Sequence, residues 1–462
     1  MTPDLPTPQP DAVDALRAGK PFSGIPALEG ELRFDKAALD AASHDFGGLV
    51  HRRPAAVLRP GSPEDVAIAV RHCREHGLKV AGRGQGHSTY GQAQVRSGLV
   101  VELGALNTIE VHEDTATATV GSGVVWSDLL RATLAHGLTP PAFTDYLELS
   151  VGGTLSAGGL GGQIGRHGTQ VDNVVELQVV TGEGELTTCS PSVRPDLFRA
   201  VLGGLGQCGI ITRATISLVP APRFVRHHVL TFPTVEAITT QQTKLIEEGR
   251  FDYLVGQALP GPDGWTYMIE AGTYDGVAAD DERLTGDLGH ASADVQDVPY
   301  FDFVNRLAPS VEALKAMGEW QRPHPWYDSF LPASAVNAVV EETLAGLKGN
   351  AIGATAVILL YPVPTAKCTT PLPVMPDEEL VYLFSLLKTA SAGADSAEEM
   401  VAANRVQYDV TRAAGGCWYP IGSVPLTKDE WASHFGAFWT EFEAARHRYD
   451  PDGILTPGQR IF

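Results

Sequence analysis

Apolar and polar positions near the start of the chain predict a strand, a helix and a second strand in quick succession. The apolar run AAVLRP (55–60) predicts a strand, and residues 62–77 have the apolar spacing of a helix. That helix would begin at Ser62, an N-cap residue followed by a proline and two acidic residues. LKVAG (78–82) predicts the second strand, which leads directly into a glycine-dense loop at 82–91.

The same reasoning predicts further elements on either side of residue 220. Before it we expect a hairpin at 109–123, a helix from Ser127 to near Gly137, strands at 174–180 and 185–189, and a short helix then a long strand within 196–221. After it we expect alternating strands such as 251–260 and 265–272, helices at about 333–346 and 397–414, and one helix over 431–449. This change of texture places a domain boundary near residue 220.

Length and composition favour a globular protein of at least two domains. The 462 residues exceed what one hydrophobic core usually organises, and 44% hydrophobic residues with 49 Gly and 32 Pro are typical of an α/β or α+β fold. The net charge of -21 argues against a nucleic-acid partner and an anionic membrane surface, and no apolar run reaches transmembrane length. Five separated cysteines predict reduced thiols without a metal site. Because MTPDLPTPQP shows no secretory signal, we expect a cytoplasmic location.

The loop at 82–91 is the most unusual segment of the sequence. GRGQGHS (82–88) places His87 among glycines, which supply positive φ angles and free N–H groups suited to an anionic pyrophosphate. No helical pattern follows Ser88, so the loop is not the dinucleotide fingerprint of a Rossmann fold. Taken alone, the string is more often a tight turn with an exposed histidine.

A second glycine-dense run, VGGTLSAGGLGGQIGRHG (151–168), follows Thr144-Asp145-Tyr146-Leu147, and the combination is far more specific. With GRGQGHSTYGQA, TDYLELSVGGTLSAGGLGG, VVTGEGELTTCSP, FDY, HPW and YDPDGILTPGQRIF, the protein resembles FAD-linked oxidases of the vanillyl-alcohol oxidase type, and among them the cytokinin dehydrogenases. The match runs from about residue 45 to the end. It implies an α+β, two-domain fold: a PCMH-type FAD-binding domain, and a substrate domain whose antiparallel sheet is covered by helices. We expect a loose leader at 1–30, the FAD-binding domain at 31–220, the substrate domain at 221–425, and a segment at 426–462 that returns to the FAD-binding domain.

The resemblance implies how FAD would be held. His87 matches the histidine that bonds covalently to the flavin 8α carbon, and since no cysteine stands near Tyr146, we expect a single covalent bond. The other implied cofactor contacts are Gly82, Gly84, Gln85, Gly86, Ser88, Gln92, Asp145, Ser150, Thr154, Ser156, Leu160, Ile210, Ile211, Trp418, Tyr419 and Gln459.

The resemblance also implies a catalytic role for two carboxylates. Asp145 matches the aspartate that accepts a hydrogen bond or proton from the substrate amine while hydride leaves for flavin N5, and desolvation near a flavin would make it a usable base. Without the motif, an Asp after Thr at a turn is usually an N-cap. Glu270 matches a glutamate that holds the purine ring, although a strand-borne Glu is as often simply exposed. Trp326, together with Trp418 or Tyr419, could form pocket walls, though an aromatic on a strand is more often core.

Three departures from the family pattern lie near the expected pocket. Val255 stands where the cytokinin enzymes typically have the glutamate of FDYVEG, Gln85 where an arginine is common, and PTAKCTTPL (364–372) where Asn, Lys and Trp are usual. The leading hypothesis is oxidation of an N6-substituted adenine, with a quinone or dioxygen as the electron acceptor. A related oxidase of an alcohol, sugar or secondary-metabolite alkaloid stays open, as does a flavin-carrying binding module without turnover.

Overall fold

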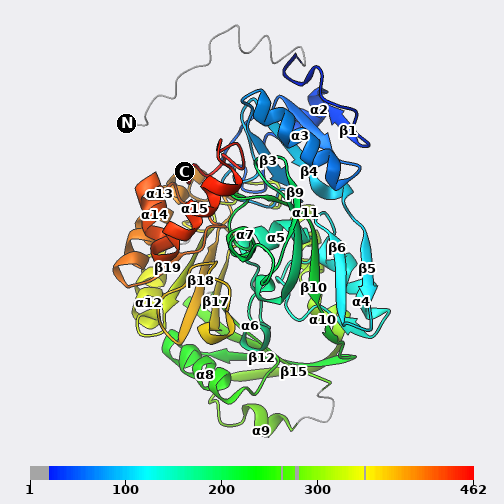
Figure 1. Cartoon of the computed structure of the whole chain (residues 1–462). Helices are drawn as coiled ribbons and strands as arrows, with labels where there is room; N and C mark the ends of the chain where they lie inside the picture. Colours follow the sequence, from blue (N-terminus) through cyan, green and yellow to red (C-terminus); the bar gives the residue numbers. More distant parts are fainter. Residues whose placement is uncertain (1–19, 262–263, 276–279, 348–349) are drawn as a thin grey trace.

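The computed structural model describes residues 20–261, 264–275, 280–347 and 350–462, and most of the predicted leader therefore lies outside the described residues. Its elements form an upper region built from the first half of the sequence and a lower region dominated by one large sheet (Figure 1). The fold is α+β, as predicted from the sequence.

The upper region contains two main sheets. The first has the order β1-β2-β4-β3, with strands Glu31–Arg33, Ala56–Arg59, Leu99–Glu102 and Val80–Arg83. The second has the order β5-β6-β10-β8-β9, with strands Ile109–His112, Thr117–Gly121, Ile210–Ser217, Val174–Val180 and Leu186–Cys189. A small pair joins β7 (Leu138–Thr139) to β11 (Val219–Pro220). The helices here are α2 (Lys36–Ala41), α3 (Pro63–Glu75), α4 (Trp126–Leu134), α5 (Val151–Ala157), α6 (Ile164–His167) and α7 (Pro195–Val201).

Helix α3 forms where the sequence predicted it. The Ser62 side chain accepts from Asp65 N, and Pro63 occupies the first turn. Its apolar face includes Val66 and Val70, which are fully buried in the core beneath the first sheet. β2, α3 and β3 thus confirm the predicted strand, helix and strand, and β3 leads directly into the glycine loop.

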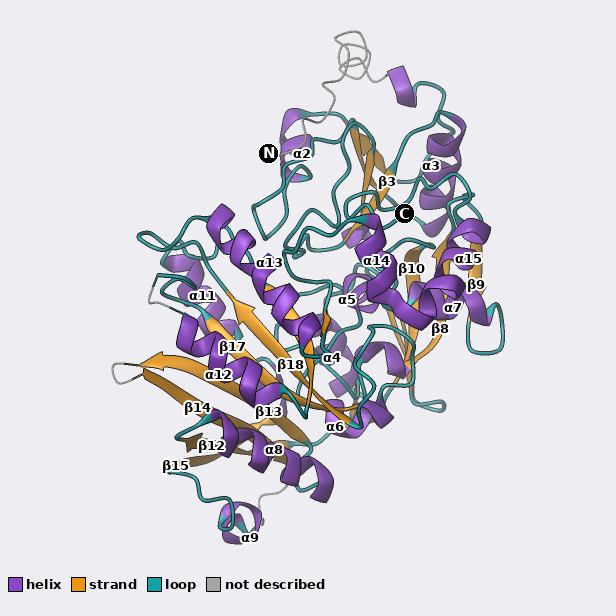
Figure 2. Cartoon of the chain, turned by 90° about the vertical axis from the view of Figure 1, so that its left-hand side faces the viewer, coloured by secondary structure: helices purple, strands orange, loops and turns teal. Residues whose placement is uncertain are grey.

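The lower region is an eight-stranded antiparallel sheet. Its order is β15-β12-β14-β13-β17-β18-β16-β19, with strands Ser292–Pro299, Phe224–Phe232, Gly264–Tyr274, Tyr253–Gly261, Val357–Pro364, Leu380–Leu387, Tyr327–Pro332 and Cys417–Trp418. One face is covered by α8 (Val235–Glu248), α12 (Val336–Gly346) and α13 (Ala397–Ala413), as Figure 2 shows. The short helices α9 (Asp281–Thr285), α10 (Tyr300–Val304) and α11 (Ala308–Ala316) lie in the connections. The antiparallel sheet and its helical cover confirm the expected architecture.

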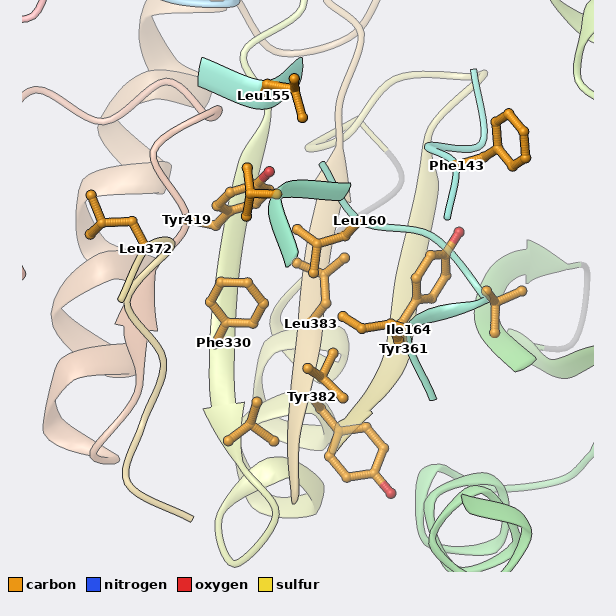
Figure 3. Packing of buried hydrophobic residues seen from close by; sticks show 14 of the residues in the cluster. Phe143, Leu155, Leu160, Ile164, Phe330, Tyr361, Leu372, Tyr382, Leu383 and Tyr419 are labelled. Atoms are coloured by element: carbon orange, nitrogen blue, oxygen red, sulfur yellow. The ribbon is translucent and has the colours of Figure 1, made fainter. Parts of the chain in front are cut away.

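The open face of this sheet packs on the upper region. Leu155, Leu160 and Ile164 of the second glycine-dense segment belong to the same buried cluster as Phe330 and Leu383 of the sheet (Figure 3). One continuous core therefore joins the two regions, and it fixes the sheet face relative to the glycine loop.

The C-terminal segment contacts α7 of the upper region, and its helical part differs from the prediction. The single helix predicted over 431–449 is wrong: α14 (Lys428–Phe435) and α15 (Trp439–Tyr449) are separated at Gly436. Gly436 has φ +51, a left-handed conformation that ends an α-helix, which is why the backbone turns there. Beyond α15, Val80 N donates to Ile454 O at 2.8 Å and Thr456 N to Val80 O at 2.8 Å, so the tail adds to the edge of β3.

Candidate active site

The glycine loop enters the site straight from β3. Residues 84–98 contain no helix or strand, as the absence of periodicity predicted. Gly86 has φ +67, a conformation that strongly favours glycine, and the loop is fixed from behind by Asp45, whose Oδ2 accepts from Gly91 N at 2.6 Å and Ser88 Oγ at 3.1 Å. These bonds hold the loop in place, and its residues 82–88 line the cavity described next.

A large cavity lies between this loop and the open face of the eight-stranded sheet. Its volume is about 470 Å³, within the usual range for a cofactor and ligand site. Eight glycines are among its lining residues: Gly82, Gly84, Gly86, Gly152, Gly153, Gly159, Gly206 and Gly209. A wall of bare backbone next to a wall of side chains fits a dinucleotide with a pyrophosphate and a flat ring system.

Most of the residues that the sequence indicated line this one cavity. They are Gly82, Gly84, Gln85, Gly86, His87, Ser88, Gln92, Asp145, Ser150, Thr154, Ser156, Leu160, Ile210, Ile211, Trp326 and Tyr419. Trp418 and Gln459 instead line a second cavity of about 240 Å³, which shares Gln92 with the first. Glu270 is not among the lining residues described for either cavity. The cofactor and catalytic roles expected for all of these residues stay predictions.

His87 is held inside a cluster of aromatic rings. Phe46 stacks on the imidazole of His87 with ring centroids 4.0 Å apart. The ring of His324 in turn stacks on Phe46, also with centroids 4.0 Å apart. The ring centroids of Trp326 and Tyr146 lie 5.6 Å and 5.3 Å from that of the His87 imidazole. Burial, with a smaller contribution from His324, lowers the pKa of His87 to about 3. The imidazole is therefore neutral at physiological pH and keeps a lone pair.

Asp145 lines the same cavity and accepts hydrogen bonds at both oxygens. Its Oδ1 accepts from Tyr253 Oη at 2.8 Å and from Arg306 Nη2 at 3.1 Å, and its Oδ2 accepts from Tyr361 Oη at 2.7 Å. Burial, to which the negative charge of Asp145 adds, raises the pKa of both tyrosines well above the ordinary value. Both phenols therefore stay protonated and act as donors to the carboxylate.

Arg306 connects Asp145 to Glu270. Its Nε and Nη2 lie 2.9 Å from Oε1 and Oε2 of Glu270, a bidentate pair, and its guanidinium stacks over the ring of Tyr253 at 4.8 Å. Burial opposes the charge, but Tyr253, Asp145 and Glu270 together hold the pKa of Arg306 well above its ordinary value. Although burial raises the pKa of Glu270, His227 and Arg306 lower it to about 2. Arg306, which lines the cavity, and Glu270, which is not among its lining residues, are thus a charged pair.

The sheet supplies a mixed polar and apolar wall. Gln257, Leu359, Ser385 and Asp328 are successive register partners on four adjacent strands, and all four line the cavity. Asp328 is 2% exposed and its Oδ2 has no hydrogen-bond partner among the described residues. Burial raises the pKa of Asp328 to about 7. The wall therefore carries a carboxyl group that is partly protonated at neutral pH.

The departures noted in the sequence occupy different places. Val255 is fully buried and lies directly opposite Glu270 in the β13–β14 register. Gln85 lines the cavity. The segment 364–372 begins at the end of β17 and is bound to Asp172, whose Oδ1 accepts from Thr369 N at 2.7 Å and Thr370 N at 2.9 Å; none of its residues is among the lining residues of either cavity. Only the first two departures therefore adjoin the cavity or the Arg306 cluster.

Several residues of the site escaped sequence reasoning. Arg306, Tyr361 and Phe46 come from segments separated by up to hundreds of residues, and no local motif marks them, whereas His324 belongs to the HPW motif but was given no role. The sequence offered one signal for Arg306, which stands among the apolar residues of YFDFVNRL. An arginine that is buried there needs a partner.

Comparison with known proteins agrees with this architecture. Residues 54–190 match the model of an FAD binding domain, and residues 263–462 match a model described as cytokinin dehydrogenase 1, FAD and cytokinin binding. The fold is similar to that of 6-hydroxy-D-nicotine oxidase from Arthrobacter nicotinovorans, with a TM-score of 0.73, 21% identity, and coverage of 93% of this chain and 97% of that chain. These matches and the cavity define an FAD-dependent oxidoreductase.

The sequence relatives narrow the class. An uncharacterized oxidoreductase, ORF5 in the fasciation locus of Rhodococcoides fascians, is 38% identical over 94% of this chain and 99% of its own length. Cytokinin dehydrogenase 4 of Oryza sativa subsp. japonica is 39% identical over 95% of this chain and 91% of its own length. The chain belongs to the cytokinin dehydrogenase family, as its motifs indicated.

Two further features bear on the expectations from composition. All five cysteines are free thiols, as predicted. No helix in the described part of the sequence is both long and apolar enough to cross a membrane.

Proposed function

We propose that this oxidoreductase acts on an N6-substituted adenine and oxidises the bond between N6 and the first carbon of its substituent. The observation that carries the proposal is Asp145: a carboxylate on the cavity wall, held at both oxygens by neutral phenols and a cation. FAD, when bound, supplies the acceptor for a hydride from the carbon next to the substrate nitrogen. Asp145 accepts the hydrogen bond of that N–H group and stabilises the positive charge that develops on nitrogen as hydride leaves. Water then hydrolyses the resulting imine to adenine and an aldehyde.

Other residues of the protein position the reactants. The glycine loop at 82–88 would hold the pyrophosphate, and Trp326 together with the row from Gln257 to Asp328 would form the wall against which the substrate lies. The row leaves room for a flat ring and presents both polar and apolar groups to it. A quinone or dioxygen would reoxidise the flavin.

We further propose that His87 is covalently bonded to FAD through a ring nitrogen. The neutral, aromatic-stacked imidazole supports this role, because a lone pair is needed to form the bond to the 8α carbon. Acid-precipitated protein should stay yellow, and a His87→Ala variant should release its flavin into the supernatant. A colourless wild-type pellet would show that the flavin is bound without a covalent link.

The test of the substrate assignment is product analysis. Incubation with N6-isopentenyladenine and a quinone should yield adenine and the matching aldehyde in equal amounts. A second candidate function is oxidation of an alcohol, a sugar or a secondary-metabolite amine by the same residues. Val255 supports this second function, because it is fully buried at a position where cytokinin enzymes typically carry a glutamate. Turnover of such a compound, with none of N6-isopentenyladenine, would select this second function.

A further inference from the structure

Asp145 has one hydrogen-bonding position left open in the described structure. A carboxylate oxygen can accept about two hydrogen bonds. Oδ1 already accepts two, from Tyr253 and Arg306, whereas Oδ2 accepts one, from Tyr361. Oδ2 therefore retains a lone pair for the N–H of a substrate, provided that Arg306 stays where it is.

The contact between Arg306 and Asp145 is weaker than the bidentate pairing that an arginine and a carboxylate can form. The guanidinium of Arg306 meets Asp145 through one nitrogen only, at 3.1 Å, which is a looser contact than the fork-to-fork pairing that arginine makes with a carboxylate. The side chains of Arg306 and Asp145 are each 17% exposed, so their attraction is little screened by solvent. A bidentate pair between them would occupy the open position of Asp145.

Glu270 prevents that rearrangement. It takes the bidentate pairing instead, with both its oxygens 2.9 Å from Arg306, and its side chain is 14% exposed. It is anchored on β14, and His227 Nε2 lies 3.0 Å from its Oε1. Since Glu270 is not among the described lining residues of the cavity, its effect on a substrate must pass through Arg306.

We infer that Glu270 is a positioning residue, which holds Arg306 on Oδ1 of Asp145 and thereby leaves Oδ2 free to accept the substrate N–H. This inference rests on the proposed role of Asp145, and it assigns Glu270 no contact with the substrate ring. It also defines the substrate at its reacting atom: a neutral nitrogen that carries a hydrogen and becomes positive as the hydride leaves, next to a carboxylate whose charge is not fully neutralised.

A double-mutant cycle on the flavin-loaded enzyme tests the inference. Glu270→Gln keeps the shape and removes the charge, so Arg306 should pair fully with Asp145, and the rate constant of anaerobic flavin reduction should fall roughly 10- to 100-fold. In an Arg306→Met background, the same Glu270→Gln change should alter the rate less than about threefold, because the residue it acts through is gone. Arg306→Lys provides a second background if the methionine variant does not fold. If Glu270→Gln instead weakened substrate binding by the same factor in the wild-type, Arg306→Met and Arg306→Lys backgrounds, Glu270 would contact the substrate directly. That result would overturn the inference.

A binding measurement without turnover gives an independent readout. Benzylguanidine and benzylurea have nearly the same shape but differ in charge, and each can be titrated against the flavin absorbance of the oxidised enzyme. The wild type should prefer the cation, and Glu270→Gln should lose most of that preference, because Arg306 then covers Asp145. Unchanged preference in Glu270→Gln would contradict the inference. If N6-isopentenyladenine fails to reduce the wild-type flavin, the proposed substrate is wrong, whereas the charge preference still decides the role of Glu270.

Discussion

The phenol of Tyr361 donates a 2.7 Å hydrogen bond to Oδ2 of Asp145, although the two residues are 216 positions apart. Tyr361 stands on β17 of the large sheet, and Asp145 precedes the second glycine-dense segment of the upper region. The bond therefore crosses the interface between the upper and lower regions. Its geometry depends on the packing of both, so the reactive carboxylate is placed by the fold rather than by its local sequence.

Removal of that bond should slow the reaction. We expect Tyr361→Phe to reduce the rate constant of flavin reduction roughly tenfold, since a hydrogen bond to a charged group contributes about 1.5 kcal/mol or more. Stopped-flow absorbance under anaerobic conditions measures it. Tyr382→Phe is the matched control, because its hydroxyl donates to Thr239 O at 2.9 Å away from the cavity; it should cost about 1 kcal/mol of stability and leave the rate unchanged. Equal rates in wild type and Tyr361→Phe would mean that the bond has no part in positioning Asp145.

The second glycine-dense segment makes room for Tyr253. A Cβ at Gly162 would lie 2.3 Å from the Tyr253 ring, and Leu254 N already donates to Gly162 O at 2.9 Å, so the strand cannot easily withdraw. Gly162→Ala should therefore lower the free energy of unfolding by about 1–3 kcal/mol and displace the phenol from Asp145, which slows flavin reduction. Denaturant unfolding and stopped-flow absorbance measure both. Gly104→Ala, where no described atom lies within 4 Å of the added carbon, should change neither; matching behaviour of the two variants would contradict this prediction.

The aromatic stack on His87 should matter for flavin attachment. Phe46→Leu removes the ring that holds the imidazole at 4.0 Å, so we expect a smaller fraction of covalently bound flavin. Acid precipitation, with absorbance read in pellet and supernatant, measures that fraction. Phe34→Leu, at a position that is 43% exposed, serves as the control and should retain the wild-type fraction. An unchanged fraction in Phe46→Leu would assign the stack a purely structural role.

Asp328 predicts a pH-dependent stability. Burial raises its pKa in the folded protein to about 7, above the ordinary value of 3.8, so the folded state binds the proton more tightly than the unfolded state. The resulting stabilisation is present below pH 3.8 and is lost as the pH rises through 7. The free energy of unfolding of Asp328→Asn should therefore rise relative to that of the wild type across that pH window, by up to about 4 kcal/mol at pH 8. Urea unfolding at pH 5 and pH 8 checks the difference; a gap that does not widen with pH would contradict it.

The features that the sequence did indicate are those whose signals are local. The N-cap of α3, the glycine loop and the segment after Asp145 are each read from neighbouring residues, and the structure brings the last two to one cavity. Arg306, Tyr361 and Phe46 were missed because they act through contacts made only in the folded state. The split between α14 and α15 was missed because one glycine overrides a continuous helical pattern.

The role expected for Glu270 shows the limit most clearly. Its position on a strand was read correctly, but whether its carboxylate reaches the cavity depends on Arg306, from a loop 36 residues later. In the structure Arg306 donates to both carboxylate oxygens of Glu270. Sequence reasoning named the carboxylate without the partner that decides what it can do.

The most direct test of the central claim is anaerobic mixing of the flavin-loaded enzyme with N6-isopentenyladenine, in the wild type and in Asp145→Asn. The account predicts rapid bleaching of the flavin absorbance in the wild type and a rate roughly 100-fold lower or more in the variant, with the flavin content unchanged. Bleaching at the same rate in both proteins would contradict the role of Asp145. No bleaching in the wild type, with bleaching by an alcohol, would contradict the proposed substrate.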